Sequence, residues 1–325
     1  MHCFPDSGDD IVYADDLVLI AENPETLDKL LKTLTRWCLD NGMSINHAKT
    51  KIVHFRSPKK EICRFSFSCC GNDTEYTDSY KYLGIEFTEH LNWIKLIDNV
   101  AISANRAANY LIAKAINSGA LVYEVFTHLY SMLVLPIIEY SSFLWGHTPY
   151  TQIAKIQNNL VRSFLGVNRS APIVAMLGDM GWLPMLTITQ ISCVRFWLRL
   201  TKMSEDRLNQ KIFTEAHRWA CMGYKHWIAR TLDILKKDRT ELDLNPMCTL
   251  DHNPDIHQYK EGLVARFRNE WQKEINRIPE GSESGGRLGM YRRIKKEPAP
   301  EIYVVSKNSV GVRIVIAGQD WGAYP

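Results

Sequence analysis

The sequence predicts an α+β protein in which short antiparallel strands come first and a long series of helices follows. Within the first ninety residues, apolar and polar residues alternate over short segments that turn-forming residues separate. From Leu91 onward, apolar residues recur every three or four positions, as on one face of a helix. The chain has 325 residues, of which 46% are hydrophobic and 23% charged, so it is long enough for more than one packed core.

The first predicted element is a β-hairpin over residues 11–20, where two apolar runs flank two adjacent carboxylates. Ala14, Asp15 and Asp16 fall at or near its tip. Ionised carboxylates are costly to bury unless they are paired or bound to metal, and Mg²⁺ favours carboxylate and phosphate oxygens. In a two-metal site, Mg²⁺ would hold both oxygens of a phosphoryl displacement. The alternative is a plain turn, because Asp favours turns.

A helix follows, with Asn23 as its N-cap and Pro24 at its first position. It should end at Gly42 and lie beneath the first hairpin. Its predicted core stripe is Leu27, Leu30, Leu31, Leu34 and Cys38.

Further strands are predicted over residues 52–55, 65–69, 74–77 and 80–87. A turn over residues 71–73 should join the second of these strands to the third. Gly84, within the last strand, would let another backbone come close, which a side chain would block.

Helices are predicted from Leu91 to about Ser118, over residues 121–135, and over residues 153–165. The chain stays helical and rich in aromatics from Pro172 to about residue 278. Tryptophans at helical spacing are usually core residues, although exposed ones can stack on nucleobases. The tryptophans of this region are Trp182, Trp197, Trp219, Trp227 and Trp271.

Residues 280–286 form a glycine- and serine-rich linker, and the densest basic cluster of the chain follows it. Such a cluster suits non-specific phosphate binding, and the alternative is a disordered tail. Its cations are Arg292, Arg293, Lys295 and Lys296.

A net charge of +3 means that any nucleic-acid surface must be local. The eight cysteines form no Cys-x-x-Cys pair, which favours reduced thiols in an intracellular protein, in the nucleus or the cytoplasm. The apolar run over residues 132–138 is too short to span a bilayer, so no membrane partner is expected.

Three segments carry a resemblance to a known family. Tyr13-Ala14-Asp15-Asp16 resembles the YxDD box of reverse transcriptases, more specifically of non-LTR retrotransposons of the jockey-like or a related clade. The likeness continues, in the family's order, through residues 42–51 (Gly-Met-Ser-Ile-Asn-His-Ala-Lys-Thr-Lys) and 79–84 (Ser-Tyr-Lys-Tyr-Leu-Gly). It extends more loosely through residues 136–140 and 177–182.

The resemblance implies a partial polymerase palm over residues 1–88, a helical thumb-like domain over 89–170, and a C-terminal helical region over 171–279. Residues 280–325 would be a linker and basic tail. The family carries a further metal-binding carboxylate and its fingers region before the YxDD box. The expectation is therefore a C-terminal part of a longer polymerase, inactive alone.

The implied activity is RNA-directed DNA polymerisation, with an RNA template, a DNA primer and deoxynucleoside triphosphates as partners. Asp15 and Asp16 would hold Mg²⁺, and Lys49 would protonate the leaving pyrophosphate. The primer end would sit on Tyr82, Leu83 and Gly84. The alternative for Lys49 is a solvated lysine in a loop, and the alternative for the predicted primer grip is a plain sheet edge.

Nucleic-acid contacts are expected at Arg106, Lys114 and Arg162 and at the four tail cations, unless these helical cations are simply solvated. The competing classes are a non-enzymatic helical nucleic-acid-binding module from a decayed retroelement, and a purely structural or protein-binding helical fold.

Overall fold

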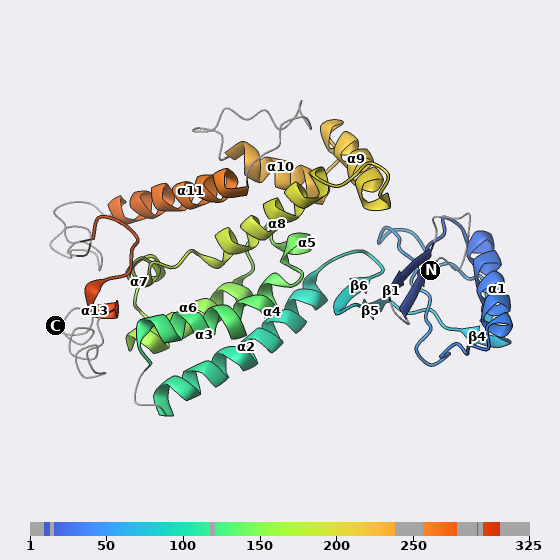
Figure 1. Cartoon of the computed structure of the whole chain (residues 1–325), viewed down its shortest axis with the longest axis horizontal. Coiled ribbons are helices and arrows are strands. Elements are labelled where there is room, and N and C mark those ends of the chain that lie inside the picture. The colour runs from blue at the N-terminus through green and yellow to red at the C-terminus, as the bar shows by residue number, and fades with distance from the viewer. Residues whose placement is uncertain are drawn as a thin grey trace. The chain divides into compact units, whose positions relative to one another are not determined.

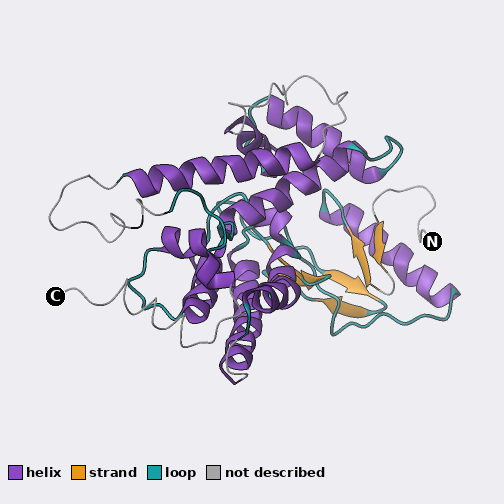
Figure 2. Ribbon diagram, turned by 60° about the vertical axis from the view of Figure 1, so that its left-hand side comes forward, coloured by secondary structure: helices purple, strands orange, loops and turns teal. Residues whose placement is uncertain are grey.

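The computed structural model describes residues 10–13, 16–117, 121–237, 256–277, 291 and 295–305. The chain divides into two compact units, Met1–Leu96 and Ile97–Pro325. The strands lie in the first unit, and the described part of the second consists of helices and loops (Figures 1 and 2). The predicted α+β class is thus confirmed in its coarse form, while the four-domain division stays a prediction.

The first unit contains three antiparallel hairpins, each a separate two-stranded sheet. Two of them close with a two-residue turn in which both residues have positive φ, 49° and 78° at Cys70-Gly71 and 46° and 81° at Leu83-Gly84. Such turns match the twist of the strands that they join. The pairs are β1 (Asp10–Tyr13) with β2 (Asp16–Leu19), β3 (Phe67–Cys69) with β4 (Asn72–Thr74), and β5 (Ser79–Tyr82) with β6 (Ile85–Thr88).

Three predicted strand features of this unit are wrong in detail. The single strand predicted over residues 80–87 is instead two strands, β5 and β6, and Gly84 lies in the turn between them. The turn after β3 is Cys70-Gly71, so Asn72 and Asp73 belong to the returning strand. The predicted strand over residues 52–55 is reduced to one bridge, in which the Ile52 amide donates to the Glu75 carbonyl at 2.9 Å. Ile52 is buried, whereas Phe55 is exposed, so the segment leaves the sheet after one residue.

Helix α1 (Pro24–Asp40) begins as predicted, because the Asn23 side chain accepts a hydrogen bond from the Thr26 amide at 2.8 Å. Its buried Leu31 packs with Ile52, Phe67 and Cys69. Leu19 of β2 is packed against the same cluster. The helix therefore supports β3 first and the first hairpin through Leu19, whereas the sequence predicted the first hairpin alone.

The second unit is built from helices of very different length. The predicted helix over 121–135 stops at Leu133, and a short helix with Pro136 in its first turn follows. The helices are α2 (Ile94–Asn117), α3 (Tyr123–Leu133), α4 (Leu135–Glu139), α5 (Ser142–Trp145), α6 (Thr151–Leu165), α7 (Ile173–Met180), α8 (Met185–Thr201), α9 (Leu208–Cys221), α10 (Trp227–Lys237), α11 (Ile256–Asn276) and α13 (Ile302–Val305).

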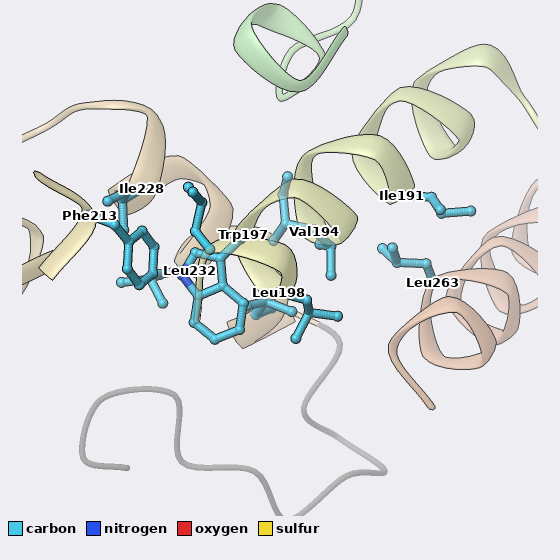
Figure 3. Packing of buried hydrophobic residues seen from close by; sticks show 11 residues of the cluster. Ile191, Val194, Trp197, Leu198, Phe213, Ile228, Leu232 and Leu263 are labelled. Carbon is cyan, nitrogen blue, oxygen red and sulfur yellow. The ribbon is translucent and has the colours of Figure 1, made fainter. Parts of the chain in front are cut away.

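Aromatic side chains form one of its cores. Phe126 stacks on Phe164 with ring centroids 4.4 Å apart, and Tyr130 stacks on Trp182 at 4.2 Å. A second core surrounds Trp197 of α8, which lies among side chains of α9 and α10 such as Phe213 (Figure 3). Aromatic stacking adds to the burial of area, so these contacts fix α3, α6 and the α7–α8 connection together.

Burial of the tryptophans, predicted from their spacing, is confirmed for Trp182, Trp197 and Trp271. Trp227 is half-buried, and Trp219 contradicts the prediction, because 49% of it is exposed. Among the described cysteines, Cys63, Cys69, Cys70, Cys193 and Cys221 are free thiols. Among the described helices, none is long and apolar enough to cross a bilayer.

Candidate active site

The β1–β2 hairpin presents a carboxylate at its end. Tyr13 is paired with Asp16 in the register, and Ala14 and Asp15, which connect them, lie outside the described residues. Asp16 is exposed, whereas the rest of β2 is half-buried. Because Leu19 is held against the α1 core, the strand is fixed at one end and offers Asp16 to solvent at the other.

Tyr82, in the hairpin predicted to grip a primer, lies close to this carboxylate. Burial raises the pKa of the Tyr82 hydroxyl, and the negative charge of Asp16 raises it further. The hydroxyl oxygen is buried and has no hydrogen-bond partner among the described residues. Asp16 and Tyr82, which the resemblance assigns to one site, are therefore near enough to interact electrostatically, and the Tyr82 hydroxyl is left unsatisfied.

The turn between β5 and β6 carries backbone strain. Leu83 has φ +46°, a left-handed conformation that costs an L-residue roughly 1–2 kcal/mol. Gly84 has φ +81° and adopts it without that cost. Strained residues persist where their surroundings hold them, and such residues cluster at functional sites. Sequence reasoning singled out Gly84 for close backbone approach, but the strain falls on its neighbour.

Lys49 is exposed and sits in a tight turn, where its amide donates to the Asn46 carbonyl at 3.1 Å. The Tyr80 hydroxyl donates to the Lys49 carbonyl at 3.0 Å. Tyr80 belongs to β5, two residues before Tyr82. This bond ties the loop of the predicted general acid to the predicted primer grip. The resemblance placed Tyr80 in the segment that is similar to the primer grip, but it assigned no role to this residue itself.

The described residues are compatible with a Mg²⁺ site in which Asp16 supplies a ligand and other positions of the coordination shell stay open. The Asp16 carboxylate is exposed, and no ion pair within the described part of the chain occupies it. Carboxylate oxygens are hard donors, which Mg²⁺ selects, and the ion usually completes its shell with water and substrate phosphates. The described residues contain no group of three acidic, histidine or cysteine side chains that would form a closed cage.

The cations predicted to contact nucleic acid fall in different surroundings. Arg106 and Lys114 are exposed on α2, and the Lys114 ammonium lies 5.6 Å from the ring centroid of Tyr110. Arg162 is half-buried in the last turn of α6, and its Nε has no hydrogen-bond partner among the described residues. Arg292 and Arg293 lie outside the described residues, and Lys296 is exposed.

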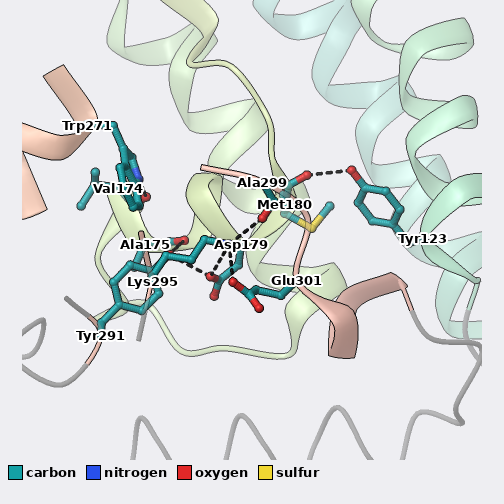
Figure 4. Close-up of polar contacts among 10 residues, drawn as sticks. All are labelled: Tyr123, Val174, Ala175, Asp179, Met180, Trp271, Tyr291, Lys295, Ala299 and Glu301. Carbon is teal, nitrogen blue, oxygen red and sulfur yellow. Dashed lines mark hydrogen bonds and ion pairs between the residues drawn. The ribbon is translucent and has the colours of Figure 1, made fainter. Parts of the chain in front are cut away.

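Lys295 corrects the prediction of a basic tail. It is only 5% exposed, and its ammonium is hydrogen-bonded to the Glu301 carboxylate and to the Ala299 carbonyl (Figure 4). Asp179 of α7 lies 3.9 Å away. Because these oxygens surround the ammonium inside the protein, Lys295 is not available to a phosphate. A count of cations along the sequence could not separate it from Lys296.

The side chains near Lys295 pack closely on α7 because position 178 of that helix is a glycine. A Cβ at Gly178 would lie 2.8 Å from the Trp271 indole nitrogen and 2.9 Å from the Tyr291 hydroxyl oxygen. The indole donates to the Val174 carbonyl at 2.9 Å, and the Tyr291 hydroxyl donates to Asp179 at 2.8 Å (Figure 4). Residues 177–182, which resemble the family loosely, are therefore a packing site here.

Comparison with known proteins bears on the site. Residues 10–87 match the family described as reverse transcriptase (RNA-dependent DNA polymerase). That segment of the chain is similar to a reverse transcriptase domain. The match includes Asp16, Lys49, Tyr82 and Gly84, and it ends before the helical unit.

The chain is also 30% identical over 133 residues to a Caenorhabditis elegans protein described as uncharacterized and transposon-derived. The similar region covers 41% of this chain and 47% of that protein, so the chain spans about half the length of this relative. No solved structure matches the chain at a significant level. The two matches support a retroelement reverse transcriptase.

Proposed function

We propose that the chain belongs to the RNA-directed DNA polymerase of a non-LTR retrotransposon, which adds deoxynucleotides to a primer 3′-hydroxyl on an RNA template. The observation that carries this proposal is the meeting of Asp16 with Tyr82. Two hairpins far apart in sequence bring an exposed carboxylate within electrostatic range of an unsatisfied buried hydroxyl. Both lie within the residues that match a reverse transcriptase.

In this proposal Asp15 and Asp16 hold Mg²⁺, and Lys49 donates a proton to the leaving pyrophosphate. The bound ion would supply charge stabilisation to the phosphates at which the nucleotide is transferred. The β5–β6 hairpin seats the primer end, because its strained Leu83 and its Gly84 expose backbone at the turn. The Tyr80–Lys49 hydrogen bond keeps the acid and the primer seat in a fixed relation.

Two carboxylates from one hairpin fill only part of the octahedral shell of Mg²⁺. The proposal therefore includes a further carboxylate from another strand and a fingers region, both supplied by polymerase sequence joined before this segment. Residues 1–88 would then complete a palm, and residues 89–170 would act as a thumb along the template–primer duplex, with Arg106 and Lys114 on its surface. The 325-residue chain alone would bind substrate without extending it.

The test is primer extension on an RNA template with Mg²⁺ and deoxynucleotides, using the chain alone and the chain joined to such a segment. In the joined protein, Asp15→Asn or Asp16→Asn should slow extension by roughly 100-fold or more, since metal stabilisation is worth several kcal/mol. Asp73→Asn, an exposed carboxylate on β4 in the same unit, is the matched control. Near-normal rates in Asp15→Asn would overturn the proposal.

Lys49→Ala should lower the rate of the chemical step more than primer affinity, and Lys49→Arg should restore part of it. The non-enzymatic alternative, a nucleic-acid-binding helical module, predicts salt-dependent binding without extension in both proteins. The exposed cations of α2 would support that binding.

A further inference from the structure

The two faces of the β5–β6 hairpin carry different kinds of side chain. Residues directly opposite each other in an antiparallel register share a face of the sheet, and alternate residues of one strand do so too. One face holds Tyr80, which donates to the Lys49 carbonyl, and Tyr82, which lies within electrostatic range of the candidate metal ligand. The candidate site therefore uses this face. The opposite face is polar throughout, because it consists of the register pairs Ser79–Thr88 and Lys81–Glu86.

The hairpin is buried through its polar face. Within β5 and β6, the buried residues are Glu86 and Thr88, which are 8% and 9% exposed. The Leu31 cluster, on which the other two hairpins pack, takes no described side chain from β5 or β6. A carboxylate is costly to bury unless it is paired and hydrogen-bonded. The buried anchor of this hairpin is therefore polar, and Glu86 requires partners there.

The segment that leads into α2 supplies those partners. Lys95, the second residue of α2, places its ammonium 2.8 Å from the Glu86 carboxylate and also donates to the Ser79 hydroxyl. The Thr88 hydroxyl donates to the Asn92 carbonyl at 3.1 Å, and it accepts from the Asn92 amide at 3.1 Å. Ser79 belongs to β5, whereas Glu86 and Thr88 belong to β6. Both strands are thereby tied to the start of one helix.

Each charge of the Glu86–Lys95 pair needs the other. Burial opposes ionisation of Glu86, but hydrogen bonds with Lys95 and then Ser79 outweigh it, so the pKa of this carboxyl lies below its ordinary value. Lys95 lies in the first turn of α2, where the helix dipole disfavours a cation and no acidic residue of that turn compensates. The compensating carboxylate comes from the hairpin instead. Lys81, opposite Glu86 in the register, is exposed.

We propose that Glu86 and Lys95 are positioning residues for the primer end, because they hold the β5–β6 hairpin to the start of α2. Glu86 lies two residues after Gly84, so the pair fixes the strands next to the Leu83-Gly84 turn. It does so from the face opposite Tyr82, without touching the primer. The inference rests on the proposed function for the identity of the substrate, and it deepens that function by naming what keeps the primer seat in place.

The first measurement follows amide hydrogen exchange in the 325-residue chain without nucleic acid. Lys95→Ala removes an exposed side chain, so the fold should persist while the amides of β5 and β6 lose protection. The amides of β3 and β4, which the Leu31 cluster supports, should stay protected. Lys95→Arg keeps the cation and should retain most of the protection. Lys32→Ala is the matched control, because it removes an exposed lysine that pairs with the mostly buried Asp28 at 2.6 Å on α1.

The second measurement is steady-state primer extension by the joined protein, with the primer and the deoxynucleotide varied separately. Misplacing a reactant by about 1 Å can cost roughly 100-fold, so Lys95→Ala and Glu86→Gln should each raise the KM for the primer by roughly 10-fold or more. The KM for the deoxynucleotide should not change. A variant that is merely less stable would lower the active fraction, and hence kcat, with both KM values unchanged.

Two further variants show whether the pair acts as one unit. Lys95→Arg should restore the KM for the primer, because it restores the ion pair. The double variant Glu86→Gln, Lys95→Ala should be no worse than either single variant, since both remove the same interaction. Lys32→Ala should extend primers like the wild type.

Unchanged exchange of β5 and β6 in both Lys95→Ala and Glu86→Gln would overturn the proposal, because the pair would then hold nothing in place. A normal KM for the primer in both variants, in a polymerase that Asp15→Asn disables, would reject the positioning role and leave the proposed function standing. Extension that persists in Asp15→Asn would reject the proposed function, and this inference with it.

Discussion

The two units differ in how much core supports their exposed functional side chains. In the first, which has three two-stranded hairpins, the β1–β2 and β3–β4 hairpins pack on one small cluster formed by Leu31, Ile52, Phe67 and Cys69. In the second, the Trp197 core and the aromatic stack support long helices. An isolated two-stranded hairpin is marginally stable in water. The candidate catalytic residues therefore lie on the part of the protein with less packing, whereas the exposed side chains of α9, such as Trp219, lie on a well-packed helix.

The largest expected effect, and the strongest test of this difference in packing, comes from replacing one buried phenylalanine in each unit. Phe67 is 3% exposed and Phe213 is 1% exposed, so replacement by alanine should cost each unit about 3–5 kcal/mol. In Phe67→Ala, the hairpins should lose protection from proteolysis. In Phe213→Ala, the helical unit should keep its circular dichroism and unfold at lower urea concentration. Phe55→Ala, at an exposed position, is the control. Equal proteolysis of both units in both variants would contradict the difference.

The second prediction compares neighbouring lysines that look alike in the sequence. Lys295→Ala leaves the carboxylates of Asp179 and Glu301 without their buried cation, and breaking a buried pair in this way costs about 3 kcal/mol or more. Lys296→Ala removes an exposed cation and should change stability by less than about 0.5 kcal/mol. Urea denaturation followed by tryptophan fluorescence measures both. Equal losses would show that the Lys295 contacts add nothing to stability.

These lysines illustrate what the sequence can and cannot predict. Local signals sufficed where the cause is local: Asn23 before Pro24 predicted the start of α1, and two apolar runs around Asp15 and Asp16 predicted the first hairpin. Lys295 donates to the nearby Ala299 and Glu301, but its burial also depends on Asp179, more than a hundred positions away, which no local pattern reveals. The same holds for the Tyr80–Lys49 bond, which joins segments thirty residues apart. Trp219 is exposed because its side of α9 has no partner among the described residues, and helical spacing cannot show that.

A third prediction concerns pH and the helical unit. Burial, and next the charge of Arg230, lower the pKa of His147 to about 4, and its Nε2 lies 2.9 Å from the Thr231 hydroxyl. The unfolded chain, with a histidine pKa near 6.5, then binds the proton more readily than the folded one. Stability is complete above about pH 6.5 and falls as the pH drops toward 4.

At pH 4.5 this loss should reach about 2–3 kcal/mol, from the difference between the two pKa values. Urea denaturation at pH 7.5 and pH 4.5 measures it. His147→Gln keeps a polar group near Thr231 but cannot titrate, so its stability should depend less steeply on pH. His217 and His226, whose pKa values burial also lowers, act in the same direction and remain in that variant. An unchanged pH dependence in His147→Gln would exclude His147 as a cause.

The smallest expected effect is at Leu83, whose left-handed backbone conformation destabilises the first unit at the candidate primer seat. Leu83→Gly relieves a left-handed backbone conformation that costs a leucine roughly 1–2 kcal/mol, so the first unit should gain about 1 kcal/mol. Cys70, with φ +49° in the equivalent turn of the β3–β4 hairpin, is the control, because Cys70→Gly relieves the same backbone conformation in a turn that is not assigned to the primer. Leu83→Gly should therefore stabilise the unit in urea denaturation, and Cys70→Gly should do so less, because it also removes the packing of the Cys70 side chain on the Leu31 cluster. If Leu83 seats a primer, Leu83→Gly should weaken primer use in the joined polymerase, and Cys70→Gly should not. A stabilised Leu83→Gly protein with unchanged primer affinity would mean that the strain is a by-product of the turn and has no part in the site.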